Sequence, residues 1–224
     1  MSKIIAIDGP AGSGKGTLAK ELAKKLNLVN IDTGATYRCV ALKVLRENVP
    51  IENEKEVTKI ARKLSIDLLP NGKVILDGED VTKEIRTKEV TEIVSPLSNN
   101  VKVREILVRL QRKIAKGKDV VMEGRDITTV VFPKAKYKFY LDASVECRAE
   151  RRYKENQEKG IDMTYEEVLE NIKKRDYNDM HKEVGALKRT EDQIYIDTTN
   201  LTIDEEVEII EKIVKGDTDE KTNR

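Results

Sequence analysis

The sequence of 224 residues predicts a three-layer α/β/α fold, in which helices cover both faces of a five-stranded parallel sheet. Short apolar runs of strand length alternate with longer segments whose apolar residues recur at helical spacing. A glycine-rich segment also joins the first apolar run to the first amphipathic segment. Alternation of this kind, with strands that are apolar throughout, is typical of parallel sheets buried on both faces.

The periodicity places each element in order. We expect strands at 3–7, 28–31, 119–122, 137–141 and 194–196. We expect helices at 15–26, 35–48, 101–116, 145–158, 164–179 and 202–215. A turn at Asp32–Gly34 precedes the second helix, and the Thr164/Glu167 and Thr202/Glu205 pairs have the spacing of a capping box.

One region interrupts the alternation. Between 64 and 81 short apolar runs surround Asn71-Gly72 and Asp77-Gly78, which are hairpin signals. We therefore expect one domain over 1–224 with a small inserted subdomain at about 50–95. The tail 216–224 has no large apolar residue, so we expect it to be flexible.

Composition excludes several classes of function. The 42 basic and 41 acidic residues nearly cancel, which argues against a nucleic-acid-coating protein. No apolar run approaches the ~18 residues of a membrane span. A single histidine and two cysteines disfavour a multi-histidine metal site or a Ser-His-Asp triad. The first residues lack the pattern of a signal peptide, so we expect a cytoplasmic protein with reduced thiols.

The glycine-rich segment is the strongest motif. Glycines let successive backbone N–H groups wrap a phosphate at a helix N-terminus, and the lysine can bridge the β- and γ-phosphates. The expected ATP-binding residues are Gly9, Pro10, Ala11, Gly12, Ser13, Gly14, Lys15, Gly16 and Thr17. A glycine-rich turn without a ligand is the alternative. Because the hydroxyl comes at Thr17 and not directly after Lys15, this P-loop resembles that of nucleoside monophosphate kinases.

Arginines at strand ends indicate the second substrate. A phosphoryl transferase must neutralise charge on both substrates and does not require a strong nucleophile or base. Arg38 and Arg125 lie just beyond predicted strands, where ligands bind in open parallel sheets. An isolated arginine elsewhere is more simply part of a solvated face.

Several stretches in order along the chain together resemble the bacterial-type cytidylate kinases. They are IDGPAGSGKGT (7–17), IDTGATYR (31–38), VREILVRLQR (103–112), GRDITTVVFP (124–133), YLDAS (140–144), RAERR (148–152), EKGI (158–161) and IDTT (196–199). The resemblance implies phosphorylation of CMP and dCMP by ATP with Mg²⁺, and no direct protein ligand to the metal, although Thr17 is a candidate contact. It also implies a subdomain at about 50–95 that binds the nucleoside monophosphate, and a mobile lid at about 148–165.

The same resemblance assigns roles to individual residues. It implies that Thr33, Arg104 and Asp126 surround the cytosine, that Arg38 and Arg125 hold the CMP phosphate, and that Ser95, Arg175 and Asp179 face the sugar. The implied catalytic residues are Lys15, Arg38, Arg125, Arg151 and Arg152. Lys182 also faces CMP, but it stands where the family usually has an arginine. Two further departures are Gly185-Ala186-Leu187, in place of a Pro-Leu pairing, and Glu123 in place of an aspartate.

Two other functions stay open at this point. One is a P-loop kinase acting on UMP, AMP or a non-nucleotide alcohol. The other is a protein that binds a nucleotide and transfers nothing. We expect ATP and CMP or dCMP as the only partners, with no nucleic acid, no membrane and a monomeric chain.

Overall fold

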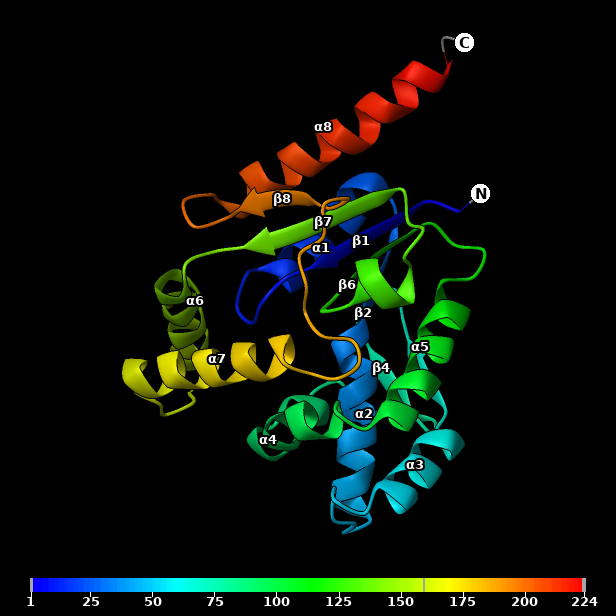
Figure 1. The fold of residues 1–224 in the computed structure, drawn as a ribbon, viewed down its shortest axis with the longest axis vertical. Coiled ribbons are helices and arrows are strands. Elements are labelled where there is room, and N and C mark those ends of the chain that lie inside the picture. The colour runs from blue at the N-terminus through cyan, green and yellow to red at the C-terminus, as the bar shows by residue number, and fades with distance from the viewer. Residues whose placement is uncertain (1, 159, 223–224) are drawn as a thin grey trace.

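The computed structural model, which describes residues 2–158 and 160–222, contains the expected parallel sheet (Figure 1). Its strands lie in the order β2-β6-β1-β7-β8, and each neighbouring pair is parallel. The strands are β1 (Ile4–Asp8), β2 (Val29–Asp32), β6 (Val120–Gly124), β7 (Tyr137–Asp142) and β8 (Ile194–Asp197). The three-layer α/β/α prediction is confirmed, and all five strands end at the same edge.

Alternating side chains of β1 enter two different cores. Ile5 and Ile7 pack with α1 (Lys15–Leu26) and α8 (Ile203–Thr222) on one face of the sheet. Ala6 packs on the other face, with α5 (Val101–Ala115) and the short π-helical segment η2 (Ile127–Val131). Both faces are therefore covered, as the apolar strands predict.

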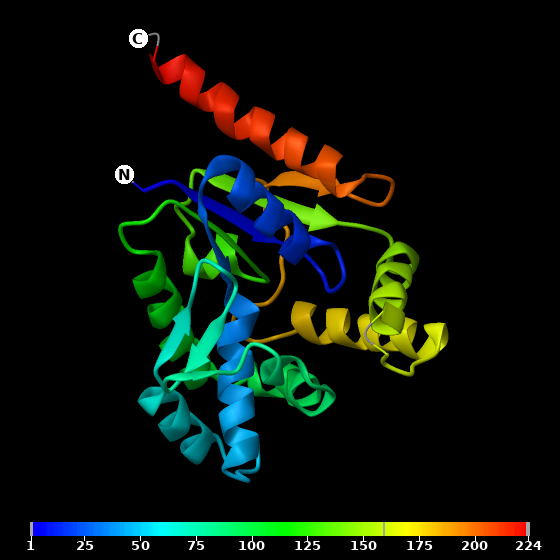
Figure 2. The same cartoon turned by 180° about the vertical axis from the view of Figure 1, so that it is seen from behind.

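The inserted region forms its own small antiparallel sheet (Figure 2). It comprises α3 (Glu54–Lys63), β3 (Ile66–Leu68), β4 (Val74–Leu76), β5 (Glu79–Asp80), the 3₁₀ turn η1 (Glu84–Arg86) and α4 (Lys88–Leu97). Its apolar residues share one core with α2 (Thr33–Arg46) and the first half of α5. Both hairpin turns are confirmed: Gly72, Asp77 and Gly78 have the positive φ values of 82°, 51° and 89° that such turns require.

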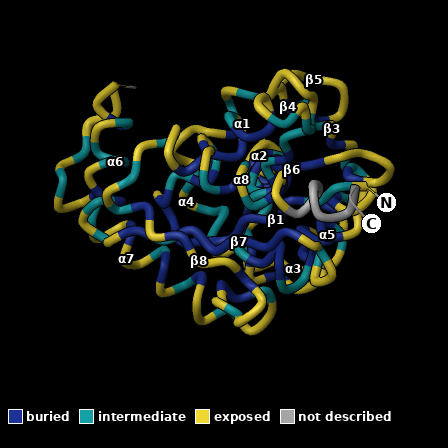
Figure 3. Tube along the Cα trace, turned by 90° about the horizontal axis from the view of Figure 1, so that it is seen from above, coloured by how far each residue is buried: buried dark blue, intermediate teal, exposed yellow. Residues whose placement is uncertain are grey.

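Helices α6 (Val145–Glu158) and α7 (Tyr165–Met180) cross and pack against each other at one side of the molecule, where much of their surface is exposed (Figure 1 and Figure 3). A small separate core around Ala149, Val168 and Ile172 holds them together. The predicted capping box of Thr164 and Glu167 is present at the start of α7. That these residues move as a lid stays a prediction.

Two helix boundaries differ from the sequence-based prediction. The expected turn at Asp32–Gly34 is wrong, because α2 already begins at Thr33, and the side chain of Asp32 caps it by accepting from the Ala35 N–H at 3.1 Å. Helix α8 continues beyond the predicted end at Lys215 to Thr222. Flexibility of 216–224 stays a prediction, and 223–224 lie outside the described residues.

Asp8, the last residue of β1, fastens the segment that follows β6. Its buried carboxylate accepts from the backbone N–H of Ile127 at 2.8 Å, from that of Thr128 at 2.8 Å and from the Thr128 hydroxyl at 2.6 Å. Burial raises the pKa of Asp8, and these three hydrogen bonds oppose the increase. The loop that carries Arg125 and Asp126 is thereby fixed to the strand that carries the P-loop.

Asp8→Asn should lower the free energy of unfolding by about 2–4 kcal/mol, because the amide N–H₂ would face buried N–H donors and leave them unsatisfied. Asp197→Asn is the matched control. Asp197 also ends a strand and accepts from a threonine N–H and hydroxyl, but it is exposed. Urea unfolding of both variants measures the difference, and an equally small loss at the two positions would contradict the anchoring role of Asp8.

Candidate active site

The P-loop has the backbone conformation that its glycines allow. Gly12 and Gly14 have φ values of 76° and 85°, and Gly14 is the N-cap of α1. At Gly9 a Cβ atom would lie 2.0 Å from the carbonyl oxygen of Leu141, so any side chain there would collide with β7. The loop therefore turns tightly at the carboxyl edge of the sheet and leads into the N-terminus of α1.

Lys15 lies buried within the loop itself. Its Nζ atom donates to the carbonyl oxygen of Pro10 at 2.7 Å and contacts the hydroxyl of Ser13 at 3.1 Å. Burial, followed by the positive charge of Arg125, lowers the pKa of Lys15 to about 7, although the carboxylate of Glu123 opposes the decrease. Nearby positive charge thus makes this ammonium group costly to keep protonated.

A buried ion pair between α6 and α7 braces the P-loop. Arg148 donates to the carbonyl oxygen of Ala11 at 2.9 Å and pairs with Asp176. Asp176 in turn accepts from the Ala11 N–H at 3.1 Å. The sequence analysis missed Asp176, and only its position beside Arg175 on a predicted helix could have pointed to it.

Cations from several elements gather beside the loop around one carboxylate. Asp179 on α7 accepts from Arg125 Nε at 2.7 Å and from Lys182 Nζ at 2.7 Å. Although burial acts to raise it, Arg125 and Lys182 hold the pKa of Asp179 well below its usual range. Burial and Arg125 lower the pKa of Arg175 to about 10. The local positive charge therefore exceeds what Asp179 can balance.

The remaining predicted catalytic arginines border this cluster. Arg38 donates to the carbonyl oxygen of Ile85 at 3.0 Å and to the hydroxyl of Thr91 at 2.9 Å, which ties α2 to the inserted subdomain. Burial, then Arg86, lowers the pKa of Arg38. Arg152 pairs with Glu155 at 2.9 Å on its own helix.

Arg151 lies beside Gly14 of the P-loop. It donates to the Thr198 carbonyl oxygen at 2.6 Å. Gly14 lies close to both Arg151 and Glu206: a Cβ atom there would lie 3.7 Å from Arg151 Nη1 and 3.9 Å from Glu206 Oε2. The Glu206 carboxylate is buried and has no hydrogen-bond partner among the described residues. Burial raises the pKa of Glu206 to about 7. The sequence analysis also missed Glu206, since nothing in the helical pattern distinguishes it from exposed neighbours.

Arg104 and Asp126 form a second buried pair next to the cation cluster. They are hydrogen-bonded to each other, with side chains 6% and 9% exposed. Burial raises the pKa of Asp126, and Arg104 opposes the increase. Arg104 Nε is buried and has no acceptor among the described residues, so the pair retains an unused donor.

Three further residues that were predicted to contact CMP lie on α2, on α4 and in the loop that follows α7. The hydroxyl of Thr33 donates to the Glu123 carbonyl oxygen at 2.8 Å, at the end of β6. Ser95 lies half-buried on α4, where its carbonyl oxygen accepts from Ser98. Lys182 lies close enough to influence the pKa of Asp126. Thr33 and Lys182 therefore lie near the pair at the carboxyl edge of the sheet, whereas the Ser95 carbonyl oxygen makes its hydrogen bond within its own segment.

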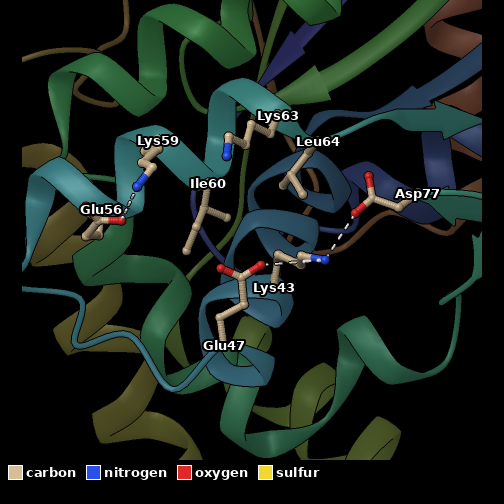
Figure 4. Close-up of a pocket in the computed structure, with 8 residues that line it drawn as sticks. All are labelled: Lys43, Glu47, Glu56, Lys59, Ile60, Lys63, Leu64 and Asp77. Carbon is tan, nitrogen blue, oxygen red and sulfur yellow. Dashed lines mark hydrogen bonds and ion pairs between the residues drawn. The ribbon is translucent and has the colours of Figure 1, made fainter.

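A separate hollow between α2 and α3 does not share these properties (Figure 4). Two of its lysines pair with its carboxylates, and Lys43 does so with Glu47 at 3.6 Å and with Asp77 at 3.3 Å. Lys59 pairs with Glu56 at 3.2 Å. Because each of its carboxylates already has a cationic partner, the residues gathered at the carboxyl edge of the sheet are the better candidate site.

Comparison with known proteins agrees with this geometry. The family model described as cytidylate kinase matches residues 5–216. The chain belongs to the cytidylate kinase family. It is 54% identical over 214 residues to the cytidylate kinase of Caldanaerobacter subterraneus subsp. tengcongensis, covering 96% of this chain and 95% of that protein. It is 50% identical to the cytidylate kinase of Desulforamulus reducens, covering 96% and 98% of the two chains.

Solved structures support the fold alone. An uncharacterised protein from Eubacterium ventriosum superposes with a TM-score of 0.52 at 15% identity, covering 96% of this chain and 99% of the other. Lys182, Glu123 and Gly185, where the sequence predicts departures from the usual family pattern, all lie beside the residues described above.

Asp179→Asn should lower the free energy of unfolding by about 3–5 kcal/mol at pH 7, because it leaves Arg125 and Lys182 without their shared carboxylate. The pKa of Asp179 is lowered by folding, so its contribution is present above the unfolded pKa of ~3.9 and is lost as the pH falls below that value. The gap between wild type and variant should therefore shrink between about pH 5 and pH 2.

The control is Glu79→Gln, which breaks the exposed pair with Arg46. Its effect in the same denaturation series should be much smaller. A gap for Asp179→Asn that does not change with pH, or that matches the control, would contradict the shared-carboxylate interpretation.

Proposed function

We propose that this chain transfers the γ-phosphoryl group of ATP to CMP and dCMP, giving ADP and CDP or dCDP. The observation that carries the proposal is the buried Arg104–Asp126 pair, with its unused Arg104 Nε donor, beside a cation cluster and a P-loop. The pair suits the edge of a base, and the cation cluster and the P-loop each suit a set of phosphates. Membership of the cytidylate kinase family supports the same substrates.

ATP binds on the P-loop in this proposal. The backbone of Gly9–Thr17 surrounds the β-phosphate, and Lys15 leaves the Pro10 carbonyl oxygen to contact the β- and γ-phosphates. Arg151 and Arg152 approach from the lid at about 148–165. Its closure would exclude water, which would otherwise hydrolyse ATP.

The acceptor phosphate is held by Arg38 and Arg125, with Arg175 behind them. This phosphate is already anionic at neutral pH, so no general base is needed. Electrostatic stabilisation of the transferring group does most of the work. The acceptor phosphate would also offset the positive charge of Arg125, which after burial is the main cause of the lowered pKa values of Arg175 and Lys15.

Arg104, Asp126 and Thr33 read the base, while Ser95, Asp179 and Lys182 face the sugar and the rest of CMP. A carboxylate accepts from the exocyclic amine of cytosine, and Arg104 donates to its ring carbonyl or nitrogen. Uracil would place a carbonyl oxygen against the Asp126 carboxylate, and neither group has a proton to donate to the other. Discrimination against UMP follows.

Mg²⁺ would enter with ATP, and the residues present fit it. Among the described residues there is no cluster of three metal-ligating side chains, but Mg²⁺ usually keeps several waters and needs few protein ligands. The carboxylate of Glu123 lies near the P-loop, and the Thr17 hydroxyl is exposed at the start of α1. These oxygen atoms would hold the hydrated ion, which supplies charge neutralisation when bound.

We also propose that the chain works as a cytoplasmic monomer. Both cysteines are free, as reduced thiols in the cytoplasm would be. Among the residues described, no helix has the length and apolar character needed to cross a membrane. The inserted subdomain at about 50–95 would bind the acceptor through Arg38 and α4.

The test is ADP release from Mg·ATP with CMP, dCMP, UMP, AMP or no acceptor at matched concentrations. Rapid release is expected with CMP and dCMP only. Asp126→Asn should lower kcat/KM for CMP by roughly 10- to 100-fold, because one hydrogen bond to a charged group is lost, and should narrow the preference for CMP over UMP.

Other outcomes would replace the proposal. A preference for UMP or AMP would indicate another nucleoside monophosphate kinase, with the base site wrongly assigned. ATP binding without acceptor-dependent release would favour a nucleotide-binding protein. Asp67→Asn, which changes an exposed residue of β3, serves as the control for the loss of a carboxylate.

A further inference from the structure

The loop that follows α7 passes directly over the Arg104–Asp126 pair. At Gly185 the backbone has a φ value of 69°, which favours glycine. A Cβ atom there would lie 1.7 Å from Arg104 Nη2, 2.4 Å from Arg104 Cζ and 2.6 Å from Asp126 Oδ2. Each distance is far shorter than a non-bonded contact, so only a residue without a side chain can occupy this position while the pair stays in place.

Asp179 holds this loop on both sides of Gly185. Lys182 donates to the Asp179 carboxylate at 2.7 Å, and the Leu187 N–H donates to the Asp179 carbonyl oxygen at 2.8 Å. Ala186 and Leu187 are buried. The loop cannot move away without breaking these contacts. A side chain at Gly185 would therefore displace Arg104 and Asp126 and not the loop.

The atoms that would collide are the ends of two side chains and not backbone. Arg104 is restrained by Asp126 and by the Ser98 carbonyl oxygen, so displacing its guanidinium disturbs the pair as a unit. The core clusters do not include this contact. A substitution at Gly185 would therefore alter the geometry of the pair more than the stability of the fold.

We propose that Gly185 is a positioning residue for base selection: its bare backbone forms the wall that holds Arg104 and Asp126 in the arrangement that reads cytosine. The inference rests on the proposed function, in which this pair contacts the base. The wall also keeps water from the pair, which strengthens its hydrogen bonds to the base. A displacement of about 1 Å is enough to cost such a contact.

The test compares Gly185→Ala and Gly185→Asn with the same substitutions at Gly117. Gly117 has a similar φ of 75°, but a Cβ atom there would meet nothing within 4 Å. Alanine imposes the same backbone strain at both positions, whereas asparagine tolerates this conformation. The Gly185 variants should raise KM for CMP roughly 10- to 100-fold and narrow the CMP-over-UMP ratio of kcat/KM, with KM for ATP unchanged. The Gly117 variants should change only Tm.

A double-mutant cycle separates collision from a general loss of structure. In an Arg104→Ala background most of the space beside Gly185 is open, so Gly185→Ala should have no further effect on the CMP-over-UMP ratio and should lower Tm only by the strain that Gly117→Ala shows. This comparison remains informative if Gly185→Ala alone fails to fold, because removing Arg104 should then restore folding. Additive effects of the two substitutions would overturn the proposal.

Two failures can be told apart. If Asp126→Asn leaves the CMP-over-UMP ratio unchanged, the base-reading role of the pair is wrong and the proposed function fails with it. If Asp126→Asn collapses the ratio but both Gly185 variants behave like those at Gly117, the function stands and the role of Gly185 is wrong. Equal losses with CMP and UMP at Gly185 would also overturn it.

Discussion

The crowding of positive charge at the carboxyl edge of the sheet is the constraint on which the site depends. Burial, and then the positive charge of Arg125, lowers the pKa of both Lys15 and Arg175. Folding places Arg125 and Lys182 around Asp179, which is their shared carboxylate, and places Lys15 near Glu123. A site with such an excess of charge is suited to anions, and two nucleotides supply them.

The rest of the fold holds this arrangement in place. Asp8 joins β1 to the loop after β6, and Arg148 with Asp176 joins the P-loop to α7. Asp179 then joins α7 to Arg125 and to the loop that contains Gly185. Residues from distant parts of the sequence are thus connected by buried hydrogen bonds, which cost free energy if only one partner is removed. The same contacts that stabilise the fold set the geometry of the candidate active site.

Local patterns were enough to predict much of this structure. The P-loop, the five strands, both hairpin turns and the capping box at Thr164 follow from spacing and turn chemistry within a few residues. The predicted turn at Asp32–Gly34 was wrong because Asp32, the last residue of β2, is also the N-cap of α2. Contacts such as Gly185 against Arg104, or Asp176 against Ala11, depend on tertiary packing and leave no periodic signal in the sequence.

Proton uptake on nucleotide binding tests the central claim most directly. Burial and neighbouring positive charge lower the pKa of Lys15 to about 7, so the free protein should hold this proton less tightly than an ordinary lysine does. Phosphates beside Lys15 should raise its pKa again, so binding of Mg·ADP at pH 8 should be accompanied by net proton uptake. Calorimetry in buffers of different ionisation enthalpy measures this uptake, with Lys15→Met as the control that abolishes it. Zero uptake or proton release by the wild-type protein would contradict the account.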